Sequence, residues 1–226
     1  MRLSEWKPPV VSQIAAIDVS VCIVSWNVWE DLRVCLASLF GGDNQARFEV
    51  IVVDNGSTDG SADYVSQHYP QIRQLRLQGN FGYAGGANRA LSVARGRYLF
   101  LLNQDMVLEP GWLEAMLNAF RQYGDTVLGC KALTTDERVL HAGGRIAWPL
   151  GLPSHRGHLE ADDGRWDAME DVDYVNGAAW GFSRTVLERV GWLDEGFWPG
   201  YYEDVDFCFR ARDLGVRVLY NPEAVV

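Results

Sequence analysis

The feature that most constrains the fold is a short apolar run, Tyr98-Leu-Phe-Leu-Leu-Asn-Gln-Asp105, which ends abruptly in a carboxylate. A run this short, bounded by Gly96 and Pro110, is typical of a β-strand buried on both faces. The earlier runs 19–25 and 48–54 also end in polar residues. Asn and Asp favour turns, which explains one such ending. Three endings together predict a ligand site at the carboxyl edge of a parallel sheet.

Helices and strands alternate along the first half of the chain, which predicts an α/β fold with a doubly wound, mostly parallel sheet flanked by helices. An arm at 1–17 precedes this pattern, and the Gly- and Pro-rich stretch 142–171 is typical of a long functional or mobile loop. The other predicted strands are 72–77, 126–131, 172–175 and 216–220. The predicted helices are 29–40, one capped by Asp59 and ending near 69, one ending near 95, then 110–123, 185–190 and 201–214.

Composition restricts the partners and the compartment. The 226 residues are 48% hydrophobic, enough for one large domain, and the net charge of −10 with scattered Lys and Arg argues against nucleic-acid binding. An acidic protein that binds phosphate groups commonly uses a metal ion or helix N-termini. The four cysteines lack the spacing of a metal or redox site, and no apolar run reaches about 18 residues. We therefore expect a cytoplasmic chain with reduced, buried cysteines and no membrane span.

The glycine-rich segment 79–90 leads into a predicted helix. Glycines let backbone N–H groups approach a ligand, and a helix N-terminus favours an anion such as a diphosphate. Close packing of small residues against the sheet explains the same pattern, and both explanations can hold. The segment follows the third strand rather than the first, which argues against a Rossmann dehydrogenase. His155 and His158, in the polar loop, are interpreted as solvated residues rather than metal ligands.

Five motifs occur in order: VSWN at 24–27, VVDNGSTDGS at 52–61, GNFGYAGGANRA at 79–90, LLNQD at 101–105 and YYEDVDFCFRA at 201–211. Together they resemble family 2 glycosyltransferases of the GT-A fold, most closely the bacterial rhamnosyltransferase-like branch. The resemblance covers about residues 18–226. It implies a nucleotide-sugar half at about 18–105 and an acceptor half at about 106–226, with a small antiparallel portion of sheet on the acceptor side.

The resemblance also implies donor-binding and metal-binding residues. Asp105 stands where the family has its metal-binding carboxylate, and Asn103 replaces the first Asp of that motif, so Asp105 is the main expected ligand for Mg²⁺ or Mn²⁺. The carboxylate of Asp54 is expected to accept the N3–H of uracil or thymine, which a purine does not supply there. The expected donor-binding residues are Ser25, Asn27, Asp54, Asn55, Ser57, Gly82, Gly85, Asn88, Arg89 and Asn103.

On the acceptor side the resemblance makes Asp204 the catalytic base and Glu203 its acidic partner, with Gly177 and Trp180 at the acceptor. Direct attack by an acceptor hydroxyl requires one carboxylate to take its proton. Acidic residues are also favoured at a helix N-terminus for structural reasons. We keep that structural explanation for Asp206, which is spaced to pair with Arg210.

The implied function is inverting transfer from a UDP- or dTDP-sugar, such as dTDP-rhamnose, to a glycan or lipid-linked acceptor in surface polysaccharide synthesis. Such a role is compatible with peripheral contact at the inner face of the cell membrane. The chain ends at 221–226 within a predicted strand, so we expect it to be truncated at its C-terminus. A sugar-phosphate nucleotidylyltransferase would need a basic, Gly-rich loop after the first strand, where Trp26 and Asn27 stand. A non-catalytic binding module would be favoured by loss of Asp105 or Asp204.

Overall fold

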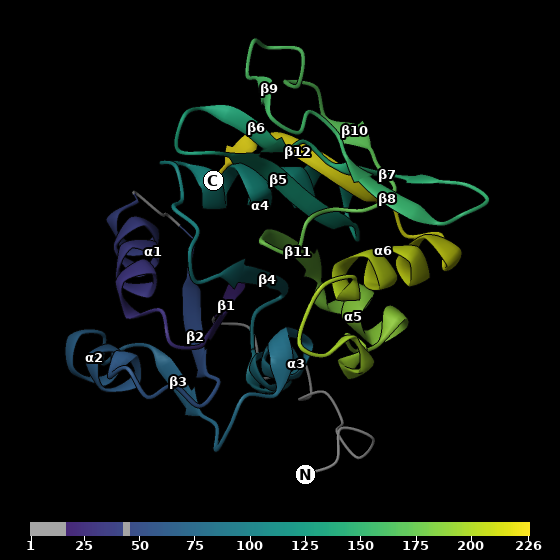
Figure 1. Cartoon of the computed structure of the whole chain (residues 1–226). Helices are drawn as coiled ribbons and strands as arrows, with labels where there is room; N and C mark the ends of the chain where they lie inside the picture. The colour runs from purple at the N-terminus through teal and green to yellow at the C-terminus, as the bar shows by residue number, and fades with distance from the viewer. Residues whose placement is uncertain (1–16, 43–45) are drawn as a thin grey trace.

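The structure, a computed structural model, describes residues 17–42 and 46–226. Its centre is a ten-stranded sheet in which eight strands follow the order β10-β12-β5-β11-β4-β1-β2-β3 (Figure 1). The predicted arm at 1–17 falls almost entirely outside the described residues. The eight strands are β1 (Val19–Ser25), β2 (Phe48–Asp54), β3 (Arg73–Arg76), β4 (Tyr98–Asn103), β5 (Val127–Leu133), β10 (Glu170–Asp171), β11 (Ala179–Ser183) and β12 (Val218–Val225).

The first half has the predicted doubly wound arrangement. Strands β1, β2, β3 and β4 are parallel, with β1 between β2 and β4. The helices that connect or flank them are α1 (Trp29–Gly41), α2 (Ser61–His68), α3 (Gly82–Val93) and α4 (Trp112–Tyr123). Each lies within about two residues of the bounds predicted for it, but the predicted cap at the start of α2 is wrong. There Gly60 is the N-cap, and Asp59 instead accepts hydrogen bonds from the N–H groups of Trp29 and Ser61.

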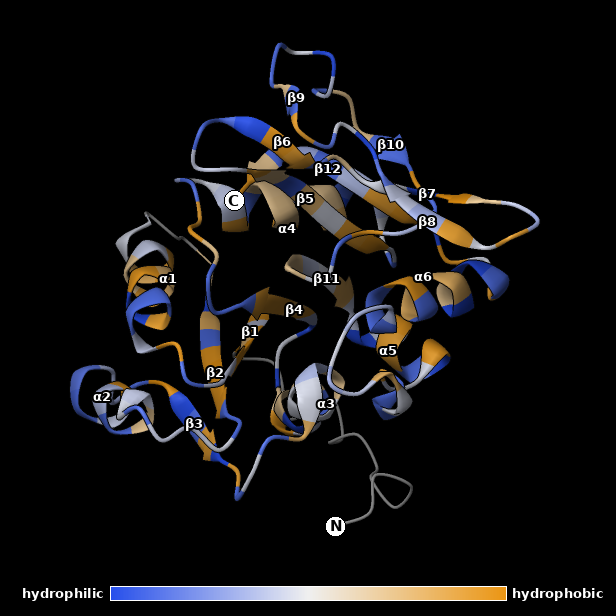
Figure 2. Cartoon of the chain, viewed as in Figure 1, coloured by the Kyte–Doolittle hydropathy of each residue, from blue (hydrophilic) through white to orange (hydrophobic). Residues whose placement is uncertain are grey.

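The central strands are buried on both faces, as their uninterrupted apolar runs predict. In β4, Leu99 and Leu101 pack into the core that contains α3, α5 and α6, whereas Phe100 and Leu102 pack into the core that contains α1 and α4. Alternate residues of a strand point to opposite faces, so one run of apolar residues supplies both cores. Figure 2 shows the hydrophobic colouring concentrated on these inner elements.

The second half departs from the prediction at β11. Residues 172–175 form no strand, only a bridge between Tyr174 and Gly144, and the strand lies later, at Ala179–Ser183. It runs antiparallel between β4 and β5. A Cβ on Gly181 of this strand would overlap the Phe100 ring. The glycine therefore makes room for a neighbouring ring within the sheet.

The predicted loop at 142–171 contains short strands. The elements here are β6 (Arg138–His141), β7 (Gly144–Ala147), β8 (Leu152–His155) and β9 (Glu160–Ala161), in addition to β10. Strands β7 and β8 form a separate antiparallel hairpin, while β6 pairs with β5 and β9. Strands β7, β8 and β9 have two to four residues and are largely exposed, so they lack the apolar alternation by which sequence reveals a strand.

The remaining helices are α5 (Arg184–Val190), a short 3-10 helix at Glu195–Phe197 and α6 (Glu203–Asp213). Two parts of the α6 prediction have different outcomes. The pair of Asp206 and Arg210 is confirmed, with 2.7 Å between Oδ2 and Nη2. Helical spacing predicts a buried stripe of Val205, Cys208 and Phe209, which is wrong at Phe209. That residue is 39% exposed, and the apolar residues of the buried face are Phe207, Cys208 and Ala211.

We predict that Gly86→Ala destabilises the fold by about 1–3 kcal/mol. Gly86 is the point at which α3 approaches β1 most closely, and a Cβ there would lie 2.6 Å from Val24 Cγ1. Gly41→Ala is the matched control, because no atom of the described residues lies within 4 Å of a Cβ at that helix end. Urea unfolding would measure both variants. Equal stabilities for the two would show that α3 moves away from the sheet at little cost.

Candidate active site

The polar ends of three strands lie together at one edge of the sheet. Ser25 lies beside Asp54 in the register of β1 with β2, and Val24 lies beside Asn103 in the register of β1 with β4. The predicted meeting of the strand ends is therefore confirmed. This is the carboxyl edge, where ligands of open α/β sheets bind.

Hydrogen bonds order the loops that follow β1 and β2. The Asn27 N–H donates to Ser57 Oγ at 3.0 Å, and Asn27 Oδ1 accepts from the Thr58 N–H at 2.8 Å. Asp54 is buried, and its Oδ1 accepts from the Ser57 N–H at 3.0 Å. The buried Oγ of Ser25 has no hydrogen-bond partner among the described residues. Hydrogen bonds thus link Asn27, Asp54 and Ser57, and the neighbouring Ser25 hydroxyl is left without a partner among the described residues.

A cavity of about 240 Å³, called here the smaller cavity, lies between these strand ends and the start of α3. Four predicted residues line it, namely Asn55, Gly82, Asn103 and Asp105, whereas Ser25, Asn27, Asp54 and Ser57 do not. No Lys or Arg is among its lining residues, so negative charge bound here needs a counter-charge from elsewhere. The full lining is Val24, Trp26, Asn55, Asn80, Gly82, Tyr83, Asn103, Gln104, Asp105 and Pro199.

The first N–H groups of α3 are already bonded within the protein. Those of Phe81 and Gly82 donate to the side-chain oxygens of Asn55 and Asn80, at 3.0 and 2.8 Å. The Tyr83 N–H donates to a backbone carbonyl before α6, at 2.9 Å. A helix N-terminus attracts anions through free N–H groups. Few N–H groups at the start of α3 therefore remain free to bind the anion that is expected there.

Three other predicted donor-binding residues lie on α3 and do not line the smaller cavity, namely Gly85, Asn88 and Arg89. The Asn88 side chain is fully buried, where it donates to the Leu193 carbonyl at 2.9 Å and accepts from the Leu193 N–H at 3.1 Å. Arg89 forms an ion pair with Glu195, with 3.4 Å between Nη1 and Oε1. A Cβ on Gly85 would lie 3.2 Å from that same Nη1. Contacts of Asn88 and Arg89 thus attach α3 to the segment that precedes α6, and Gly85 lies beside them.

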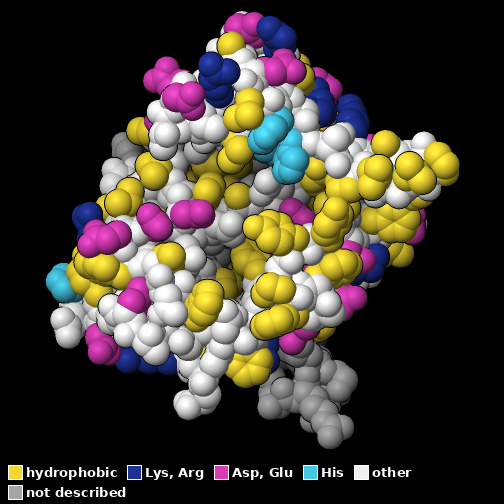
Figure 3. All heavy atoms as spheres, in the orientation of Figure 1, with side chains coloured by type: hydrophobic (Ala, Val, Ile, Leu, Met, Phe, Trp, Pro, Cys, Tyr) yellow, Lys and Arg dark blue, Asp and Glu magenta, His cyan; other side chains and the backbone are white. Residues whose placement is uncertain are grey.

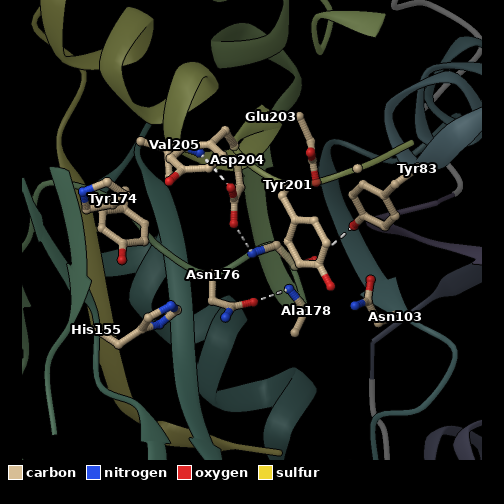
Figure 4. Close-up of a pocket in the computed structure, with 14 residues that line it drawn as sticks. Tyr83, Asn103, His155, Tyr174, Asn176, Ala178, Tyr201, Glu203, Asp204 and Val205 are labelled. Atoms are coloured by element: carbon tan, nitrogen blue, oxygen red, sulfur yellow. Dashed lines mark hydrogen bonds between the residues drawn. The ribbon is translucent and has the colours of Figure 1, made fainter. Parts of the chain in front are cut away.

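A larger cavity of about 510 Å³ adjoins the smaller one and shares Tyr83 and Asn103 with it (Figure 4). The predicted residues Gly177, Glu203 and Asp204 line it. The prediction for Trp180 is corrected, because its ring is fully buried and packs against Phe207 in the core. The full lining is Tyr83, Asn103, Pro153, His155, Tyr174, Asn176, Gly177, Ala178, Gly200, Tyr201, Tyr202, Glu203, Asp204 and Val205.

Asp204 is held in place by two backbone donors. Its Oδ2 accepts from the Gly177 N–H at 2.6 Å and its Oδ1 accepts from the Val205 N–H at 2.8 Å (Figure 4). Burial raises the pKa of Asp204 above the ordinary value, and the backbone hydrogen bonds oppose that rise. Tyr83 continues the chain of contacts by donating from its hydroxyl to the Gly177 carbonyl at 2.9 Å. A carboxylate held rigidly with raised basicity is suited to accept a proton.

Glu203 is more isolated than its neighbour. Its side chain is buried, and Oε2 has no hydrogen-bond partner among the described residues. Burial raises the pKa of Glu203 to about 7. Burying an unpartnered carboxyl group costs free energy, so Glu203 does not stabilise the fold and is a candidate functional residue.

His155, which the sequence analysis interpreted as solvated, lines the larger cavity and contacts the buried His141, a partner that sequence reasoning missed. His141 Nε2 accepts from the Asn176 N–H at 3.1 Å, so neutral His141 carries its proton on Nδ1. That Nδ1 lies 2.7 Å from His155 Nδ1, which must accept the proton, so neutral His155 carries its own on Nε2. Burial lowers the pKa of His141 to about 3. The sequence carries no signal for this contact, because the two histidines lie 14 positions apart on short strands that no apolar pattern reveals.

A divalent metal ion fits the smaller cavity only as part of a complex with a phosphate ligand. The exposed carboxylate of Asp105 and the side chain of Asn103 line the cavity together, whereas Gln104 Oε1 already accepts from the Trp26 N–H at 2.9 Å. Among residues 17–42 and 46–226, no group of three or more acidic, His or Cys side chains is placed to hold a metal. Mg²⁺ often binds through one or two carboxylates together with substrate phosphates, and this arrangement suits that mode.

The fold and the two adjoining cavities place the chain in a known class. Residues 20–191 match the family model described as Glycosyl transferase family 2, so the chain belongs to that family. Its fold is GT-A, as the five motifs imply. Within the described residues, no helix combines the length and apolar character needed to cross a membrane.

The chain is similar to several curated proteins and solved structures. It is 24% identical to the low-salt glycan biosynthesis hexosyltransferase Agl10 of Haloferax volcanii, covering 92% of this chain and 66% of that protein. It is 27% identical to the N-acetylglucosaminyl-diphospho-decaprenol L-rhamnosyltransferase of Mycobacterium tuberculosis, covering 78% and 65%. The chain spans 66% or less of the length of these relatives.

Two solved structures share the fold at low sequence identity. One is GalNAc-T7 with UDP, GalNAc and Mn²⁺, with a TM-score of 0.76 and 14% identity over 93% of this chain and 42% of that one. The other is the mannosyltransferase PcManGT of Pyrobaculum calidifontis in complex with GDP-Man and Mn²⁺, with a TM-score of 0.67 and 17% identity over 98% and 59%. At such identities the likeness shows the fold alone.

We predict that Glu203→Gln changes how stability depends on pH. The pKa of Glu203 is raised from 4.5 to about 7 in the folded protein, so the unfolded chain loses its proton first as pH rises. Wild-type stability should therefore fall between these two pH values, and Gln should remove that part of the fall. Urea unfolding from about pH 5 to about pH 8 should show a stability difference that grows with pH and levels off above the folded-state pKa. Parallel curves for the two proteins would contradict the raised pKa.

Proposed function

We propose that the chain is an inverting glycosyltransferase. In this proposal a sugar moves from a UDP- or dTDP-linked donor to a hydroxyl of a glycan or lipid-linked acceptor in surface polysaccharide synthesis. The observation that carries it is the pair of adjoining cavities, with Asp105 in one, Asp204 in the other, and Tyr83 and Asn103 shared by both. The names of the Agl10 and rhamnosyltransferase relatives support glycan synthesis.

The two cavities are assigned to the two substrates. The nucleotide diphosphate occupies the smaller cavity, and the transferred sugar lies at the shared residues Tyr83 and Asn103. The acceptor occupies the larger cavity, where its attacking hydroxyl faces Asp204. The anomeric carbon then lies between a leaving diphosphate and an incoming hydroxyl, which is the geometry that direct inversion requires.

The chemical step needs one proton acceptor on the acceptor side. The acceptor oxygen forms a bond to the anomeric carbon while the bond from that carbon to the diphosphate oxygen breaks. Asp204 takes the hydroxyl proton as the new bond forms, and its backbone bonds to Gly177 and Val205 keep the carboxylate in place. A divalent cation bound through Asp105 and Asn103 would offset the negative charge on the departing diphosphate.

The preference for a pyrimidine base rests on Asp54 and belongs to the same proposal. The neighbours bound to UDP and to GDP-Man indicate that this fold accommodates both kinds of base, so selectivity must come from side chains. Asp54 is buried and fixed by the Ser57 N–H, so its carboxylate can select a single donor such as N3–H. In binding calorimetry, GDP affinity equal to that of UDP and dTDP would contradict this role.

We predict that nucleotide binding depends on the metal through Asp105. The smaller cavity offers no Lys or Arg, so removing Mn²⁺ with EDTA should weaken UDP binding on the order of tenfold or more. Asp105→Asn should have the same effect in the presence of Mn²⁺. Asp125→Asn removes an equally exposed carboxylate from a distant turn and serves as the charge-matched control. Calorimetry that gave equal UDP affinity with and without metal would remove Asp105 from the metal site.

We predict an order of effects among the three acidic residues of α6. Asp204→Asn keeps the shape of the side chain but removes the proton acceptor, so the transfer rate should fall by ~10²–10⁴-fold with little change in UDP affinity. Glu203→Gln should act more on acceptor affinity than on rate. Asp206→Asn should cost only about 0.5–1 kcal/mol of stability through its pair with Arg210.

Transfer assays and UDP calorimetry on the same samples would test this order. A normal rate for Asp204→Asn would move the base to another residue, with Glu203 next in line. A wild-type chain that binds nucleotide but neither transfers nor hydrolyses a nucleotide sugar would favour a binding module. Formation of a nucleotide sugar from a sugar phosphate would favour a nucleotidylyltransferase.

A further inference from the structure

Two consecutive tyrosines before α6 have an unusual backbone conformation. Tyr201 and Tyr202 have φ angles of +78° and +75°, in the left-handed region that large L-residues rarely adopt. Each such residue costs free energy, and strain of this kind persists only where the surroundings impose it. The residues that directly follow are Glu203 and Asp204.

Packing of the two rings does not offset this strain. Tyr201 is 85% exposed and Tyr202 is 51% exposed. Within the described part of the chain, neither hydroxyl has a hydrogen-bond partner and neither ring has an aromatic contact. Two exposed aromatic rings on a strained backbone are unfavourable for an isolated protein, so the conformation calls for an explanation by function.

The flanking residues impose the conformation from both sides. Before the tyrosines, the Pro199 carbonyl accepts from the Tyr83 N–H, and a Cβ on Gly82 would lie 2.8 Å from Trp198 Cδ1. After them, the Tyr202 carbonyl accepts from the Asp206 N–H at 2.8 Å in the first turn of α6. The segment between these two attachments therefore has little freedom, and both rings line the larger cavity.

The opposite wall of the cavity offers polar groups. In Figure 4 the Tyr201 ring lies between Asp204 and Asn103, with Asn176 and His155 across the cavity. Asn176 Oδ1 accepts from the Ala178 N–H at 2.7 Å, and neutral His155 presents an Nε2–H because its Nδ1 faces His141. Figure 3 shows the hollow on this face bordered by hydrophobic, acidic and histidine side chains.

We propose that Tyr201, supported by Tyr202, is a stacking platform for a neutral pyranose ring of the acceptor. This inference rests on the proposed function and names the acceptor class for its larger cavity. The electron-rich face of a tyrosine ring attracts the C–H face of a sugar, while His155 and Asn176 bond its hydroxyls. Stacking on Tyr201 holds one hydroxyl of that ring toward Asp204.

Charge decides which sugars fit this cavity. Its lining contains the carboxyl groups of Glu203 and Asp204 and no Lys or Arg. A uronic acid would bring a third carboxylate into a site without a cation, which is unfavourable. The platform therefore selects neutral hexoses or deoxyhexoses over their uronates.

The test uses methyl pyranosides as probes, because they lack an aromatic group that would stack on its own. Saturation-transfer NMR with UDP and diamagnetic Mg²⁺ present should show transfer to the ring C–H protons of methyl glucopyranoside or methyl rhamnopyranoside, and much less to methyl glucuronide. Tyr201→Asn should abolish this transfer, and Tyr201→Phe should retain most of it because the ring face is kept. Asn tolerates the left-handed region, so Tyr201→Asn should also raise the melting temperature by about 2–4 °C.

Leu159→Asn is the matched control. Leu159 also has a positive φ, of +61°, and is 52% exposed, but it lines neither cavity. This variant should gain thermal stability in the same way and leave the pyranoside signals unchanged. Both variants should be more stable than wild type, but only Tyr201→Asn should lose sugar binding. This difference separates a binding role of Tyr201 from a structural one.

The outcomes distinguish this inference from the proposed function. Failure of wild-type protein to bind any nucleotide would overturn the proposed function and the platform with it. Nucleotide binding without pyranoside signals, or signals that survive in Tyr201→Asn, would overturn the platform alone. Equal signals for the glucuronide would overturn the selection of neutral sugars.

Discussion

The antiparallel pairing of β11 with β4 is the interaction on which the site depends. The N–H of Asn103 donates to the Ala178 carbonyl at 2.7 Å, and Ala179 lies beside Leu102. Asp105 follows β4 by two residues, and the turn at 176–178 that lines the larger cavity directly precedes β11. The pairing of the two strands therefore holds this turn beside the segment that contains Asp105. Gly181 makes it possible, because any side chain there would meet the Phe100 ring. The adjacency of the two cavities is therefore a property of strand pairing deep in the core.

The electrostatics of the site depend both on the lack of positive side chains in the cavity linings and on two acidic side chains. Neither cavity has a Lys or Arg in its lining, and the nearby Arg89 is paired with Glu195. Glu203 is buried and Asp204 is partly buried, and this burial raises the pKa of each carboxyl group. We expect such a site to bind phosphate weakly without added positive charge and to hold protons strongly at these two carboxyl groups. Both properties suit a reaction in which a diphosphate departs as a hydroxyl loses its proton.

Sequence reasoning was reliable where a local pattern decides the structure. The apolar runs of β1, β2 and β4 predicted their bounds and their burial on both faces, because period and length are local properties. It was unreliable where partners are distant. Asn88 bonds to Leu193, 105 positions away, and nothing local distinguishes that contact from one with a ligand. Short exposed strands such as β7 and β8 also escaped prediction, because backbone pairing rather than apolar alternation defines them.

The sequence by itself determined the fold class, the family and the edge of the sheet where the site lies, because buried strands and motif order are recorded in consecutive residues. Only the tertiary structure decided which predicted residues line a cavity and which hold the framework together. It moved Trp180 into the core, assigned Arg89 to an ion pair, and showed the His141–His155 pair and the strained Tyr201 at the larger cavity. The physical reason is that cavities and backbone strain arise from contacts between segments far apart in the chain, which no single stretch of sequence records.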